Sequence, residues 1–165
     1  MTIGRFIGGV GAVIYRKSDG RYLLLQRSPQ KDFAQSIWEP VTGRLEQGEG
    51  FVDALYREVM EEIGIAVQPM VILGTTHFYR GNPQPENELI GVVFLCQPIE
   101  EDQILISTEH ARFVWVNAAE ATALLTDNSP PTLWTRRIIQ RAEHVRQDLS
   151  PTLIEYFQQT GFELG

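Results

Sequence analysis

Cysteine is almost absent from this 165-residue chain, and so are long apolar runs. The single cysteine, Cys96, excludes an intrachain disulfide, and its place in the apolar segment 89–96 predicts a buried structural thiol rather than a nucleophile. No stretch reaches the roughly 18 apolar residues of a membrane span, and the N-terminus lacks a basic start followed by an apolar signal core. We therefore expect a cytoplasmic protein without a membrane partner.

Basic residues are also scarce, since 14 lysines and arginines face 21 aspartates and glutamates, for a net charge of -7. This balance argues against a nucleic-acid-binding surface, which is normally basic. Internal repeats, linkers and low-complexity tracts are absent, and 43% of the residues are hydrophobic, which is ample for a core. We expect residues 1–165 to form a single domain.

Hydrophobic periodicity and turn residues predict a chain that mixes strands with helices. The expected strands cover about residues 6–16, 21–27, 37–41, 66–78, 88–97 and 112–116. The expected helices cover about residues 50–63, a segment starting at Asn117, and C-terminal helices within about 130–160. An Asp19-Gly20 pair favours a tight hairpin between the first two strands, and the polar loop 80–87 could close over a substrate.

The helix at 50–63 has three carboxylates on one face. At roughly 100° per residue, Glu58, Glu61 and Glu62 fall within an arc of about 100°. They occupy the last turn, where the helix dipole disfavours negative charge, so a cation should compensate. Mg²⁺ or Mn²⁺, which take carboxylate oxygens and bridge phosphates, would do so. The alternative is an acidic, solvated helix face.

The residues around this helix follow a longer pattern: Gly, five residues, Glu, seven residues, Arg-Glu, an aliphatic, any residue, Glu-Glu, any residue, Gly and an aliphatic. The matching residues are Gly43, Glu49, Arg57, Glu58, Val59, Glu61, Glu62, Gly64 and Ile65. At ordinary residue usage, a chance match is on the order of one in a million. The pattern matches the Nudix box, and the chain resembles a Nudix hydrolase over about residues 6–145.

This resemblance implies an α/β fold, a Nudix-type mixed β-sheet sandwiched between α-helices. It also implies a Mg²⁺- or Mn²⁺-dependent pyrophosphohydrolase with a small nucleotide substrate, in which water attacks a phosphorus of the diphosphate linkage. By position, the main metal ligands would be Glu58 and Glu62, and Glu61 would be a further ligand or the general base. Gly43 would contribute its carbonyl, and Arg57 with Glu49 would brace the loop against the helix.

A fourth carboxylate often comes from outside the box. Glu109 is the leading candidate, because a similar Glu-His pair precedes an aromatic strand in related enzymes. Glu88, at the start of a strand across the polar loop, is the rival. His77 and His110 are expected to be ordinary strand or loop residues.

Further residues resemble the subgroup of bacterial Nudix enzymes that hydrolyse dihydroneopterin triphosphate and deoxynucleoside triphosphates. They are Leu25, Gln26, Arg27, Trp38, Thr42, Gly43, Glu109, His110 and Trp134. Thr42 stands where most of the family has glycine, and the resemblance implies that Thr42 and Arg27 lie near phosphate, with Arg5 a weaker candidate.

The substrate stays open at this point. Trp38, Phe78 and Tyr79 could sandwich a base or pterin ring, or could pack in the core. Diadenosine polyphosphate or ADP-ribose hydrolysis is the alternative within the enzyme class. A non-catalytic nucleotide-sensing module is the alternative outside it. The oligomeric state cannot be read from the sequence.

Overall fold

A computed structural model describes residues 4–30, 34–100 and 103–165. The strands are β1 (Ile7–Arg16), β2 (Arg21–Arg27), β3 (Trp38–Glu39), β4 (Val41–Arg44), β5 (Val67–Tyr79), β6 (Glu88–Pro98) and β7 (His110–Val116). The α-helices are α1 (Phe51–Ile63), α2 (Ala118–Leu124), α3 (Pro130–Asp148) and α4 (Pro151–Thr160), with a 3₁₀ turn, η1 (Pro85–Asn87). Most of the predicted elements are confirmed to within two residues.

The short extended segment predicted at 37–41 is wrong in extent. The chain forms two strands separated by Pro40, which lacks the N–H that a continuous ladder needs. β3 pairs with β2, whereas β4 continues to Arg44 and pairs with β1, with Gly43 opposite Val10. The beginning of the Nudix box is therefore fixed to the centre of the sheet.

The seven strands found in the described residues follow the order β3-β2-β1-β6-β5, with β4 also pairing with β1 and β7 with β2. The β1 and β6 strands run parallel, and the other pairs are antiparallel. A parallel pair next to antiparallel ones makes the sheet mixed, as predicted.

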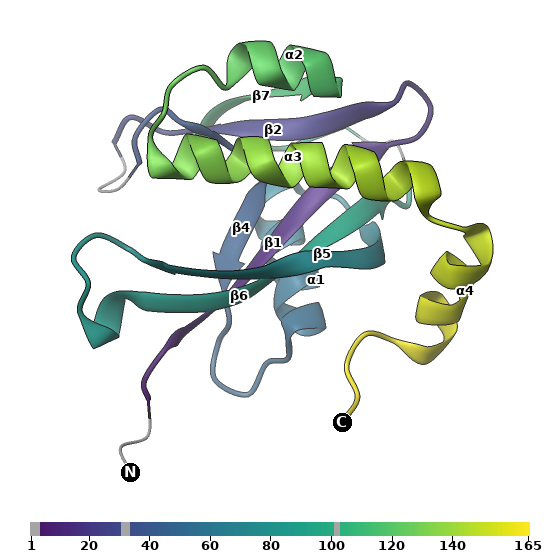
Figure 1. The fold of residues 1–165 in the computed structure, drawn as a ribbon, viewed down its shortest axis with the longest axis horizontal. Coiled ribbons are helices and arrows are strands. Elements are labelled where there is room, and N and C mark those ends of the chain that lie inside the picture. Colours follow the sequence, from purple (N-terminus) through teal and green to yellow (C-terminus); the bar gives the residue numbers. More distant parts are fainter. Residues whose placement is uncertain (1–3, 31–33, 101–102) are drawn as a thin grey trace.

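The two faces of this sheet are covered by different helices (Figure 1). Side chains alternate across a strand, so Ala12 and Ile14 of β1 join one core cluster with α1, while Val13 joins a second cluster with α2 and α3. In Figure 1, α3 lies across the front of the strands and α1 lies behind them. The prediction of a mixed sheet sandwiched between helices is confirmed.

The helix α1 packs on the sheet through Leu55, Val59 and Ile63, which are all 1% exposed or less. It ends where the glycine signal predicts, because Gly64 has φ 70°, a left-handed conformation that glycine adopts without steric cost. The opposite side of its last turn is therefore free to present polar groups. Cys96 is fully buried, as predicted. None of the helices in the described ranges combines the length and apolar character that a bilayer crossing requires.

Candidate active site

The loop between β4 and α1 is held by Arg57. Its Nε and Nη2 donate to the two carboxylate oxygens of Glu49 at 2.7 and 2.8 Å, and Nη2 also donates to the Arg44 carbonyl at 2.8 Å. The hydrogen bonds from Arg57 lower the pKa of Glu49 to about 2, so the pair stays ionised. A bidentate pair of this kind fixes the orientation of both side chains as well as pairing their charges. It therefore holds the β4–α1 loop against α1.

The Glu58 carboxylate lies directly over Gly43. Its Oε1 accepts hydrogen bonds from the Arg44 backbone N–H and from Arg57 Nη1, each at 3.0 Å. Burial raises the pKa of Glu58, against the opposing effect of Arg57. A Cβ added to Gly43 would lie 1.8 Å from Glu58 Cδ, so residue 43 must be glycine for this contact to exist.

Glu62, one turn further on, is 7% exposed. Its Oε2 is buried and has no hydrogen-bond partner among the residues that the structure describes, although the backbone N–H of Thr42 donates to the carboxylate. Burial raises the pKa of Glu62 well above its ordinary value, and repulsion by Glu39, Glu58 and Glu109 adds to the effect. A buried carboxylate surrounded by others is costly without a compensating positive charge. A bound cation would offset this electrostatic cost.

Glu39 was missed by the sequence reasoning. It is 7% exposed, and its Oε1 lies 2.9 Å from Arg27 Nη1 and 3.5 Å from His110 Nε2. Its charge is the first of the carboxylate neighbours that raise the pKa of Glu62. The available signal was a charged residue between Trp38 and Pro40 in an extended segment, since a buried carboxylate is rarely found without a partner.

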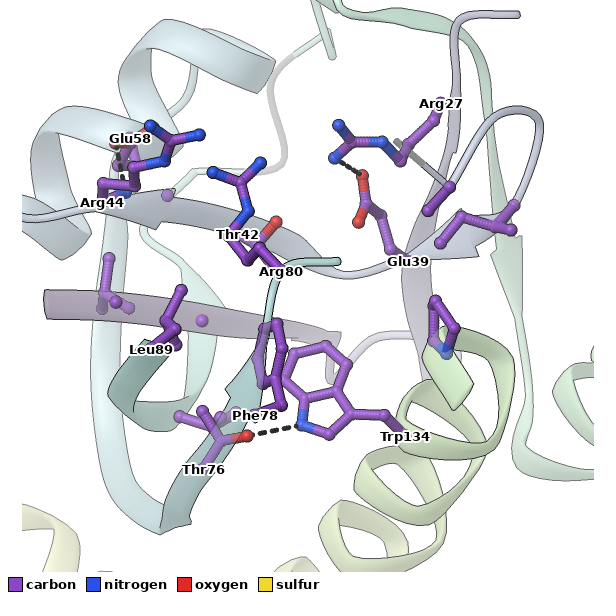
Figure 2. Close-up of a pocket in the computed structure, with 18 of the residues that line it drawn as sticks. Arg27, Glu39, Thr42, Arg44, Glu58, Thr76, Phe78, Arg80, Leu89 and Trp134 are labelled. Atoms are coloured by element: carbon purple, nitrogen blue, oxygen red, sulfur yellow. Dashed lines mark hydrogen bonds and ion pairs between the residues drawn. The ribbon is translucent and has the colours of Figure 1, made fainter. Parts of the chain in front are cut away.

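A cavity of about 1260 Å³ lies along these residues. Its lining includes most of the predicted site residues, namely Arg27, Thr42, Gly43, Arg57, Glu58, Glu61, Glu62 and Glu109. Figure 2 shows the Arg27–Glu39 pair on one side of this space and Glu58 with Arg44 on the other, with Thr42 between them. The box, β2 and the 107–109 segment therefore converge although they lie far apart in sequence.

Two of the candidates lie elsewhere. Glu88 is not among the cavity-lining residues and instead lies 2.8 Å from His77 Nε2. Arg5 precedes β1, is exposed, and also stands outside the lining. The structure therefore favours Glu109 over Glu88 as a neighbour of the box carboxylates, and it lends no support to Arg5 as a phosphate ligand.

The opposite side of the cavity is apolar and aromatic. Phe78 of β5 and Trp134 of α3 have ring centroids 6.5 Å apart, and Trp134 Nε1 donates to Thr76 Oγ1 at 3.0 Å. Leu89 completes this side and lies to the left of the two rings in Figure 2. Tyr79 also lines the cavity, whereas Trp38 is buried outside it under the Arg112 guanidinium. A planar ring would find apolar contacts here, opposite the carboxylates.

The donor set suits a hard divalent cation, because carboxylate oxygens are the ligands that Mg²⁺ and Mn²⁺ prefer. The unpartnered Oε2 of Glu62 is an oxygen that such a cation would bind. Across residues 4–30, 34–100 and 103–165, no three acidic, histidine or cysteine side chains are already gathered into a metal-binding cluster. Glu58 Oε1 is instead hydrogen-bonded to Arg57 Nη1 and to the Arg44 backbone N–H.

A mixed sheet between helices with a carboxylate-lined cavity at the end of α1 is an arrangement that a metal-assisted hydrolase of phosphate anhydrides would use. Residues 5–138 match the NUDIX domain, and the chain therefore belongs to the Nudix family.

Similar proteins agree with this assignment. The chain is 31% identical over 122 residues to dihydroneopterin triphosphate diphosphatase of Escherichia coli K12, covering 68% of this chain and 79% of that protein. It is 30% identical over 120 residues to the asymmetrical bis(5'-nucleosyl)-tetraphosphatase of Caenorhabditis elegans, covering 70% and 82%. In fold it is similar to a MutT protein from Methanosarcina mazei Go1, with a TM-score of 0.70, 24% identity, and coverage of 89% and 99%.

Proposed function

We propose that this protein is a Mg²⁺- or Mn²⁺-dependent pyrophosphohydrolase that cleaves the diphosphate linkage of a nucleoside triphosphate or a related molecule. The buried, unpartnered Oε2 of Glu62, surrounded by the charges of Glu39, Glu58 and Glu109, is the observation that supports it most strongly. A site that concentrates negative charge out of water is built to be completed by a cation.

In this proposal Glu58 and Glu62 are the main cation ligands, Glu109 is a further one, and Gly43 adds its backbone carbonyl. Bound there, the cation would lower the pKa of water and neutralise charge on the phosphate oxygens. Glu61, which is exposed and 3.3 Å from Arg57 Nη1, is the residue free to reorient and accept a proton from attacking water.

The remaining site residues hold the substrate and the loop. Arg27 donates to Glu39 through Nη1, and its buried Nε has no partner in the described part of the chain. We assign it, with the Thr42 side chain, to the phosphate groups. Arg57 and Glu49 act only as the brace. Residues 1–165 are taken as one domain, because Ile138 and Ile139 of α3 pack into the sheet core.

The substrate follows from the two sides of the cavity together. The carboxylate side takes the cation and phosphates, while Phe78 and Trp134 offer an aromatic surface for a ring. The similarity to dihydroneopterin triphosphate diphosphatase favours a triphosphate bearing a pterin or purine ring. The similarity to the asymmetrical tetraphosphatase makes a dinucleoside tetraphosphate the second candidate.

A chromatographic product screen with Mg²⁺ tests the proposal. Deoxynucleoside triphosphates, dihydroneopterin triphosphate, diadenosine tetraphosphate and ADP-ribose are offered to the parent and to Glu62→Gln, in ¹⁸O-labelled water. A monophosphate plus pyrophosphate from a triphosphate, lost in Glu62→Gln, is the expected result, and the labelled product identifies the phosphorus attacked. Cleavage of diadenosine tetraphosphate alone would select the second candidate. Tight binding without turnover by the parent would refute the proposal in favour of a nucleotide sensor.

A further inference from the structure

Arg80 stands at the point where β5 ends and the hairpin loop begins. Its backbone N–H donates to the Asn87 carbonyl across the loop at 2.9 Å, and Gly81 follows with φ 93°. The backbone therefore leaves the direction of β5 immediately after Arg80. In Figure 2 the Arg80 side chain rises from the end of β5 toward Thr42, and its guanidinium lies between Arg44 with Glu58 on one side and Arg27 with Glu39 on the other.

The Arg80 guanidinium differs from the other arginines at the site. Arg27 and Arg57 are tied to Glu39 and Glu49. Arg80 has no side-chain hydrogen bond or ion pair with any residue that the structure describes, although it lines the cavity and is half-buried. Arg44 and Arg137 also line the cavity, but both are exposed. A charged group partly removed from water without a protein partner favours an anionic ligand.

The position of Arg80 also indicates which part of a ligand it meets. Glu58, Glu62 and Glu109 would hold phosphates indirectly, through cations, at the carboxylate side of the cavity. Arg80 reaches the same space from the β5–β6 hairpin, which is the side that carries Phe78. A phosphate beside Arg80 would therefore be contacted directly by the guanidinium, from the β5–β6 side of the cavity, rather than through a cation.

We propose that Arg80 directly binds one phosphate group of the substrate chain in addition to those that the cations hold, and that it makes the cavity favour chains of three or more phosphates over diphosphates. This inference rests on the proposed function for its kinetic test. Its binding test is independent of turnover, because inorganic polyphosphates carry the same recognised chemistry without a nucleoside.

The binding test uses isothermal titration calorimetry with Mg²⁺ and two probes, inorganic tripolyphosphate and pyrophosphate. The proteins are the parent, Arg80→Gln, Arg80→Lys and the control Arg21→Gln, whose arginine is ion-paired with Glu120 outside the cavity. Arg80→Gln should weaken tripolyphosphate binding about tenfold to a hundredfold, the range for a hydrogen bond to a charged group. Pyrophosphate binding should change by less than about twofold. Arg80→Lys should be intermediate, because it keeps the charge but loses the guanidinium fork.

The kinetic test measures KM and kcat for a triphosphate that the parent cleaves. Arg80→Gln should raise KM with little change in kcat, since a phosphate that takes no part in bond cleavage is bound equally in the ground and transition states. Equal losses in kcat and kcat/KM would overturn the proposal, as would unchanged tripolyphosphate affinity in Arg80→Gln. If the parent cleaves no nucleotide, the proposed function fails, while the calorimetry still decides the role of Arg80. Unchanged Tm values exclude unfolding as the cause.

Discussion

Gly43 and Glu58 are in contact across the β4–α1 loop, and the contact leaves no room for any side chain at residue 43. The backbone N–H of Arg44 donates to Glu58 Oε1 at 3.0 Å, which places the carboxylate over the end of β4. A Cβ on residue 43 would lie 1.8 Å from Glu58 Cδ and 2.2 Å from its Oε1. The glycine of the box is therefore a spatial requirement of the carboxylate that follows 15 residues later.

Gly43→Ala should displace Glu58 and lower kcat by about a hundredfold, the loss expected when a reacting group moves by about 1 Å. Steady-state kinetics with Mg²⁺ measures this loss, and Gly165→Ala, where an added Cβ meets nothing within 4 Å, serves as the control. Parent-like kcat in Gly43→Ala would show that the position of Glu58 does not matter for turnover.

Glu109→Gln should lower kcat by about a hundredfold or more, while Glu88→Gln stays within a few-fold of the parent. Glu109 lines the cavity and repels Glu62, whereas Glu88 lies against His77 outside the lining. Loss of one ligand to a cation that stabilises the negative charge of the transition state is expected to cost on the order of 10²-fold or more in kcat. Comparing the two variants at saturating Mg²⁺ decides between them, and the reverse ranking would transfer the ligand role to Glu88.

The parts of the molecule that the sequence predicts well depend on local patterns. The bounds of α1 follow from apolar residues at helical spacing and from Gly64, and the carboxylates that share its last turn follow from geometry within one helix. The capping box of Asn117 and Glu120 is another local signal, and the structure contains both of its hydrogen bonds.

The parts that could not be predicted depend on contacts between distant segments. Glu39 enters the site because β3 pairs with β2, which brings Arg27 to it, and because β7 pairs with β2 and carries His110. No hydrophobic pattern within one segment predicts that these three residues lie together. Trp134 likewise reaches the cavity only because α3 crosses the sheet and bonds to Thr76 of β5. Burial of a charged residue is a property of the assembled sheet.

Asp127→Asn should lower Tm by about 2 °C at pH 7, a loss typical of one weakened hydrogen bond to a charged group. The Ser129 backbone N–H and the Thr132 hydroxyl donate hydrogen bonds to the Asp127 carboxylate at 2.9 and 2.8 Å, and hydrogen bonding by these two residues lowers the pKa of Asp127 from the ordinary 3.8. A lowered pKa stabilises the fold above the unfolded-state value, and this contribution is lost as the pH falls through the folded-state value. The Tm difference should therefore shrink below about pH 4. Asp148→Asn, at the other end of α3, is the control in calorimetric scans, and a difference independent of pH would contradict the argument.

The Arg27–Glu39 ion pair should show strong coupling in a double-mutant cycle. The two side chains are 16% and 9% exposed and 2.9 Å apart, so removing either one leaves a largely buried charge behind. Arg27→Ala and Glu39→Ala should each destabilise the protein, and the double variant should lose less than the sum, with a coupling energy of about 1–3 kcal/mol from urea unfolding. Glu39→Gln should cost less than Glu39→Ala, because its amide oxygen can still accept a hydrogen bond from Arg27.

The exposed Arg21–Glu120 pair provides the matched control cycle, for which much weaker coupling is expected. Additive losses at Arg27 and Glu39 would contradict this prediction and would mean that the two charges are stabilised independently of each other.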